Sequence, residues 1–147
     1  MNRTIKAFVF LILLLASKSS VAQGQVVPDG ILFQAVARDA NNNAAGNRNV
    51  YIQIYIKKGT VTGSTDYSES FKVVSNTEGI FSIIIGQGTR MSGPASLKLL
   101  DWAKSLYFVN IKIAIEPTLT NPDWKADNNY LDIGTSQLWT VPYAFAS

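Results

Sequence analysis

The stretch from Asn76 to Gln87, NTEGIFSIIIGQ, constrains the fold more than any other part of the sequence. It opens with residues that favour a turn, continues as the apolar run IFSIII, and stops at Gly86. A run this short between glycines is too brief for a helix and is rich in β-branched side chains, so it predicts a β-strand. Because nearly every side chain on both faces is apolar, we expect a central strand that lies deep between two layers of a mostly β fold.

Residues 1–22 predict a secretory signal peptide. Arg3 and Lys6 precede an apolar segment that is too short to span a bilayer comfortably, and small side chains precede Gln23. We expect the mature chain to begin at Gln23, an uncleaved membrane anchor being the alternative. The sequence therefore predicts an extracytoplasmic protein, at the cell surface, secreted or in the periplasm, with no membrane span after cleavage.

Removal of this segment changes the charge of the protein. The full sequence has 13 basic and 10 acidic residues, and three of the basic residues lie in the signal peptide. The mature chain is then close to neutral, and its lysines and arginines are scattered along it. Without a basic patch, neither nucleic acid nor anionic lipid is expected as a partner.

The sequence contains no cysteine and no histidine. Disulfides and a lipid anchor on cysteine are therefore excluded, and so are Ser-His-Asp and Cys-His catalytic systems and nearly every zinc or copper site. The length that remains after cleavage suits one domain, which apolar packing and sheet hydrogen bonds must stabilise.

Alternation of apolar and polar residues predicts further strands. The clearest is VYIQIYIKK at 50–58, whose apolar face consists of Val50, Ile52, Ile54 and Ile56. The other strands are expected at 31–38, at 67–74, at 107–116 and within 130–141, the last broken or bulged at Gly134. Glu69 is the exception on an inward face, which predicts that its end of the strand lies near an edge or the surface.

These strands predict an all-β fold, an antiparallel β-sandwich of about six to eight strands. The connection before residue 107 is either a short helix at 97–103, capped by Ser96, or an irregular crossover. The expected organisation is a signal peptide at 1–22, an extended leader at 23–30, a sandwich domain at 31–141 and an apolar C-terminal tail at 142–147.

Four blocks follow one another between Ile31 and Ala146, namely LFQAVARDANNNAAGNRNVYIQIYI, YSESFKVVSNTEGIFSIIIGQGT, DWAKSLYFVNIKIAIE and LDIGTSQLWTVPYAFA. Together they resemble the N-terminal β-sandwich module of secreted Bacteroidetes surface, adhesin and tail-fibre-like proteins. The opening RDA…GN…NV and the turn TEG before Ile80 are also similar to transthyretin-like and carboxypeptidase-regulatory-like sandwiches.

The resemblance implies a secreted structural module that often precedes collagen-like, coiled-coil or tail-fibre-like repeats. The chain departs from the pattern at Ala44-Ala45, where a proline-containing turn is usual, and nothing follows VPYAFA except Ser147. The second departure leaves two expectations open, a short standalone member or a chain whose downstream partner is supplied in trans.

A calcium loop is one interpretation of residues 39–43, DANNN. Ala44 stands where such a loop needs glycine, and Val50 stands where it needs the closing glutamate, so half of the ligand set is missing. We therefore interpret the segment as an asparagine-rich turn.

The other carboxylates predict no metal cage and no catalytic pair. No defined cage has the spacing of the three loop aspartates, Asp123, Asp127 and Asp132. Nothing in the sequence brings into one cleft the three glutamates, Glu69, Glu78 and Glu116. We predict a protein that is not an enzyme and that carries no metal or cofactor.

The apolar end of the chain is the first candidate binding site. It would aggregate if left in water, so it is either folded onto its own sheet or buried by a partner. The candidate docking residues are Leu138, Trp139, Val141, Pro142, Tyr143 and Phe145. We predict a structural or docking module of a bacterial surface or envelope assembly that binds protein partners through sheet edges and this tail, with homo-oligomerisation left open.

Trp124 and Tyr130 form the second candidate site. Trp124 lies in a polar loop, where with Tyr130 it either stacks on the face of a sugar or covers one end of the sandwich. The alternative prediction is therefore a carbohydrate-binding or adhesive module that uses these loop aromatics.

Overall fold

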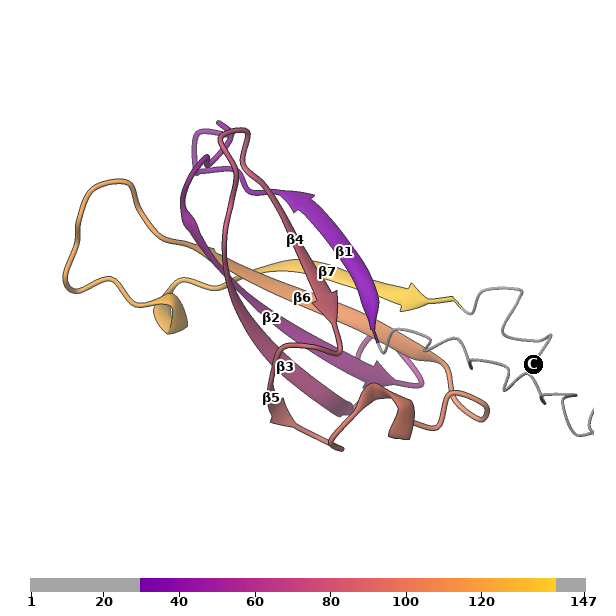
Figure 1. Ribbon diagram of the computed structural model, residues 1–147. Coiled ribbons are helices and arrows are strands. Elements are labelled where there is room, and N and C mark those ends of the chain that lie inside the picture. Colours follow the sequence, from indigo (N-terminus) through magenta and orange to yellow (C-terminus); the bar gives the residue numbers. More distant parts are fainter. Residues whose placement is uncertain (1–29, 140–147) are drawn as a thin grey trace, which may run out of the picture.

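In the computed structural model, which describes residues 30–139, the chain forms seven strands in two antiparallel sheets (Figure 1). The larger sheet has the order β5-β3-β2-β6-β7, and the smaller one pairs β1 with β4. The strands are β1 (Ile31–Val36), β2 (Asn49–Lys58), β3 (Thr65–Val74), β4 (Ile80–Ile85), β5 (Thr89–Ser92), β6 (Tyr107–Ile115) and β7 (Leu131–Leu138). Figure 1 shows β1 and β4 crossing one face of the larger sheet, and the predicted all-β sandwich is confirmed.

β2 is the central strand of the larger sheet and the base of the core. It pairs with β3 on one side and β6 on the other, and its inward side chains have no exposed surface. Cross-strand neighbours extend this apolar surface, since Ile52 lies opposite Phe71 in β3 and Ile113 in β6. Burial of each such isoleucine stabilises the fold by about 1.5–3 kcal/mol, so β2 anchors the packing of both layers.

β4 is a strand with one buried face, and the prediction that it lies deep between two layers was wrong. Its inward residues Phe81, Ile83 and Ile85 belong to the buried core, as the apolar pattern predicts. On its other face Ser82 and Ile84 are exposed. The sheet that contains β4 has only two strands, and within residues 30–139 no third layer covers its outer face.

Glu69 is fully buried, so the prediction that it lies near an edge or the surface was also wrong. Its carboxyl oxygens accept hydrogen bonds from the hydroxyl of Tyr67 (2.9 Å) and from the backbone N–H groups of Gly86 (2.6 Å) and Gly88 (2.9 Å). The two glycines lie in the turn through which the chain passes from β4 in the small sheet to β5 in the large one. Because a buried carboxyl group needs such donors, Glu69 fixes this crossing between the layers.

The connection between β5 and β6 contains one turn of 3-10 helix, η1 (Leu97–Leu99), in place of a helix over the whole of 97–103. Ser96 caps it as expected, and its side chain accepts a hydrogen bond from the N–H of Lys98 at 3.2 Å. Leu97 and Leu100 are buried against the sandwich, so the segment closes one end of the core.

The predicted signal peptide at 1–22 lies outside the described residues, as do residues 23–29 of the leader and residues 140–147. Within the part of the chain that the structure describes, no helix has the length and apolar character that a membrane span requires.

We predict that Glu69→Gln lowers the free energy of unfolding by about 1–3 kcal/mol, because the new amide NH₂ group replaces one of the two oxygens, each of which accepts a hydrogen bond from one backbone N–H group. Glu78→Gln is the matched control, since Glu78 is exposed in the turn before β4 and its replacement should change stability by less than about 0.5 kcal/mol. Urea denaturation of both variants tests this, and equal stabilities would contradict the role assigned to Glu69.

Candidate functional site

Aromatic side chains gather on the outer face of the larger sheet. Tyr51 and Tyr55 alternate along β2 with the buried isoleucines, so the pleat of the strand turns them to the opposite side. Trp124 comes from the loop between β6 and β7, and Tyr130 lies between the 3-10 turn η2 (Ala126–Asn128) and β7. We call these four half-buried residues, Tyr51, Tyr55, Trp124 and Tyr130, the aromatic face.

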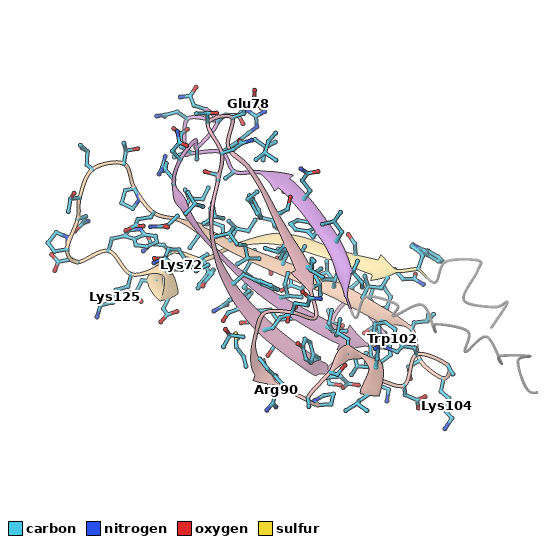
Figure 2. All side chains as sticks on the ribbon, viewed as in Figure 1. Lys72, Glu78, Arg90, Trp102, Lys104 and Lys125 are labelled. Carbon is cyan, nitrogen blue, oxygen red and sulfur yellow. The ribbon has the colours of Figure 1, made fainter. Side chains whose placement is uncertain are left out.

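Ring contacts and two lysines hold the aromatic face together. The rings of Tyr51 and Trp124 have centroids 5.6 Å apart and an interplanar angle of 51°, a tilted arrangement that aromatic pairs favour. The Nζ of Lys72 lies 5.3 Å from the centroid of the Tyr51 ring, and the Nζ of Lys112 lies 5.1 Å from that of Tyr55. Figure 2 shows Lys72 close to the loop that joins β6 to β7.

A depression of about 420 Å³ opens beside the aromatic face, between β2 and the turn from β4 to β5. Its volume falls in the range of small-molecule sites, roughly 300–1,000 Å³. Its wall combines three aromatic side chains, hydroxyl and amide groups, and one cation. The lining residues are Tyr51, Ser70, Phe71, Lys72, Gln87, Gly88, Thr89 and Tyr130.

Tyr130 has a pKa raised above its ordinary value of 10.0. The main cause is burial, which disfavours the phenolate, and the negative charge of Asp127 adds to it, as do Tyr55 and Tyr51. A hydrogen bond with the side chain of Gln53 acts in the opposite direction. Tyr130 therefore presents a neutral hydroxyl at the depression throughout the physiological pH range.

The two loop aromatics that the sequence singled out, Trp124 and Tyr130, both lie near Tyr51 of β2. Trp124 packs on Tyr51, which also lines the depression together with Tyr130. Tyr51 and Tyr55 were not among the candidate binding residues that the sequence indicated. Their alternation with isoleucine along β2 was the available signal that they share one face of the sheet. The position of Lys72 beside Tyr51 could not be predicted in this way, because it depends on the pairing of β2 with β3.

Of the predicted docking residues, the structure describes Leu138 and Trp139. Leu138 ends β7 opposite Tyr107 and packs, half-buried, against the core. Trp139 is 79% exposed. The remaining four, Val141, Pro142, Tyr143 and Phe145, lie outside the described residues.

The outer face of the small sheet is an apolar surface that the sequence analysis did not identify as a binding site. Its exposed side chains include Leu32 (72%), Val36 (45%) and Ile84 (39%). Leu32 lies opposite Ile84, and Val36 lies opposite Ile80, so the apolar residues form cross-strand pairs. We call Leu32, Val36, Ile80 and Ile84 the outer apolar face.

The acidic side chains of the described residues do not gather into one site. The side chain of Asp39 accepts hydrogen bonds from two backbone N–H groups of its own turn, which confirms the asparagine-rich turn. Asp132 accepts hydrogen bonds from the side chain of Asn110 and the N–H of Gly134, and chiefly the latter lowers its pKa. Glu116 accepts a hydrogen bond from the side chain of Asn49. Among residues 30–139 no three acidic side chains converge on a common point.

A family model described as a domain of unknown function (DUF8740) matches residues 32–123, which is more than half of the chain. The match covers the strands β1 to β6 and ends before Trp124, Tyr130 and β7. No curated protein and no solved structure matches the chain.

We predict that Tyr130 ionises above pH 10 and that Asp127→Asn lowers its pKa part of the way back, because burial remains after the charge is removed. A folded-state pKa above the unfolded value contributes stability that is present below about pH 10 and is lost as the pH rises through the folded-state pKa. NMR titration of Tyr ring carbons, with Tyr130→Phe to assign the signal, measures the shift. Asp123→Asn is the control from the same loop, and a Tyr130 pKa at or below 10 would contradict the proposed burial.

Proposed function

The chain belongs to the DUF8740 family of domains of unknown function, and we propose that it is a non-enzymatic docking module of a bacterial cell-surface or envelope assembly. Its partner is another protein, which adds an extended segment along the free edge of β1 and covers the outer apolar face. The observation that carries this proposal is a sheet of two strands packed on a sheet of five, with no described strand on the other edge of β1.

β1 is the edge strand best suited to accept a partner. An edge strand presents unpaired backbone N–H and C=O groups with which another chain can pair. The sequence of β1, ILFQAV, contains no charge and no proline, and its pairing with β4 has no bulge. By contrast, β7 is bulged next to Gly134, and β5 has only four residues.

The outer apolar face supplies the side-chain contacts for such a partner. Its two cross-strand pairs flank the polar pair Gln34 and Ser82. A strand added to β1 extends the small sheet, and its alternate side chains then lie beside Leu32 and Val36. Burial of these exposed residues stabilises the complex by the hydrophobic effect, while main-chain hydrogen bonds fix its register.

The C-terminal segment is the second docking element of the proposal. Trp139, Val141, Tyr143 and Phe145 occupy every second position, so an extended backbone would place all four on one face. The exposure of Trp139 at the end of β7 supports a role for this stripe in contact with another protein.

The proposed setting is extracytoplasmic, at the cell surface or in the periplasm. The signal-like residues 1–22 and the resemblance to modules of secreted Bacteroidetes proteins support it. Glu69, Glu78 and Glu116 lie in separate structural environments, which supports binding rather than acid–base chemistry by a carboxylate pair.

We predict that Leu32→Lys weakens partner binding at least tenfold, because it places a charge in the outer apolar face next to the pairing edge. Leu119→Lys is the matched control, since Leu119 is 83% exposed in the loop after β6. Both substitutions should change stability by less than about 0.5 kcal/mol. Proteins cross-linked to the native chain in cell envelopes are identified, purified, and titrated with both variants.

A partner that binds the native chain and Leu119→Lys equally, but Leu32→Lys at least tenfold more weakly, supports docking at β1. Equal affinity for Leu32→Lys would contradict it. Deletion of residues 140–147 in the same titration measures the contribution of the C-terminal segment separately.

A further inference from the structure

The depression beside the aromatic face has the composition of a site for a sugar ring. Pyranose rings combine apolar C–H faces with a rim of hydroxyl groups, so they pack on aromatic rings and exchange hydrogen bonds with small polar side chains. Tyr51 and Tyr130 supply the rings here, and Ser70, Gln87 and Thr89 supply hydroxyl and amide groups on the same wall. All five side chains are exposed or half-buried and therefore accessible to a ligand.

The charge of the depression selects an anionic ligand. Lys72 is the only charged side chain among the residues that line it, and none of those residues is acidic. Lys72 is exposed and forms no ion pair with a carboxylate of the described residues, although its ammonium group lies over the Tyr51 ring. Asp127 acts on Tyr130 but does not line the depression. A carboxylate on the ligand can therefore reach the ammonium group without meeting a like charge inside the site.

We propose that this depression binds an acidic oligosaccharide, with a sugar ring stacked on Tyr51 and Tyr130 and a uronate carboxylate paired with Lys72. The hydroxyl groups of Ser70 and Thr89 and the amide of Gln87 then bond to the sugar hydroxyls. Trp124 acts as a positioning residue, because its packing on Tyr51 fixes that ring at the site.

This inference does not depend on the proposed protein docking. The depression lies on the outer face of the larger sheet, whereas the outer apolar face belongs to the smaller sheet on the opposite side of the sandwich. A module with both sites would attach a protein assembly to an acidic polysaccharide.

Isothermal titration calorimetry of the full-length mature chain with tetramers of galacturonate and of mannuronate tests the proposal. The neutral tetramers of galactose and mannose are the matched ligands. We expect at least one uronate tetramer to bind at least tenfold more tightly than its neutral counterpart. Binding should perturb NMR signals of Tyr51, Ser70, Thr89 and Tyr130.

Two variants assign the contacts. Lys72→Gln should reduce the affinity for the uronate to that for the neutral tetramer, and Tyr130→Ala should weaken both at least tenfold. Lys104→Gln is the control, because Lys104 lies in the connection between η1 and β6 and pairs with Asp101 at 3.9 Å. Circular dichroism confirms that each variant is folded.

Failure of both uronate tetramers to bind at millimolar concentration would overturn the proposal, as would an unchanged affinity in Lys72→Gln. Leu32→Lys should bind the uronate as the native chain does, so the outcome here is separate from that of protein docking. A loss of uronate binding in Leu32→Lys would place the ligand on the small sheet and also overturn the proposal.

Discussion

Burial of the inward face of β2 is the constraint on which the rest of the structure depends. Val50, Ile52, Ile54 and Ile56 are completely covered, and β2 pairs on both sides over most of its length. The same alternation turns Tyr51 and Tyr55 outward, so one strand creates both the core and the aromatic face. The buried carboxyl group of Glu69 then fixes the turn through which the chain leaves the small sheet, and that turn forms part of the depression.

The number of strands explains why this sandwich has an open side. Five strands face two, so the small sheet cannot shield all of the apolar surface that the chain provides. Among the described residues, Leu131 of the larger sheet lies opposite Ile113 and remains 72% exposed. Leu32 and Val36 are exposed for a second reason, because no described layer covers the outer face of the small sheet. Exposed apolar residues next to an uncharged, unbulged strand edge are features that folded proteins usually avoid unless another chain covers them.

The local sequence pattern was sufficient to predict the strands. It was insufficient for features that depend on contacts between segments far apart in the sequence. Alternation and glycine boundaries located all of the long strands, because a pleated strand with one buried face needs residues of that period. The burial of β4 was mispredicted because it depends on whether a further layer covers the outer face of its sheet, which the local pattern does not reveal. Glu69 was misassigned because its partners are backbone N–H groups 17 and 19 residues away, which no side-chain pattern reveals. For the same reason the sequence indicated Trp124 and Tyr130 but neither Lys72 nor the depression.

The central claim is that β1 offers one free edge for pairing, and amide hydrogen exchange of the isolated protein, followed by NMR, tests it most directly. The account predicts that amides of β2 exchange slowest, since both of its edges are paired. In β1, only the alternate amides that bond to β4 should be protected, and those between them should exchange at rates close to those of an open chain. Protection of every amide from Ile31 to Val36 would show that the edge is already covered, and would contradict the account.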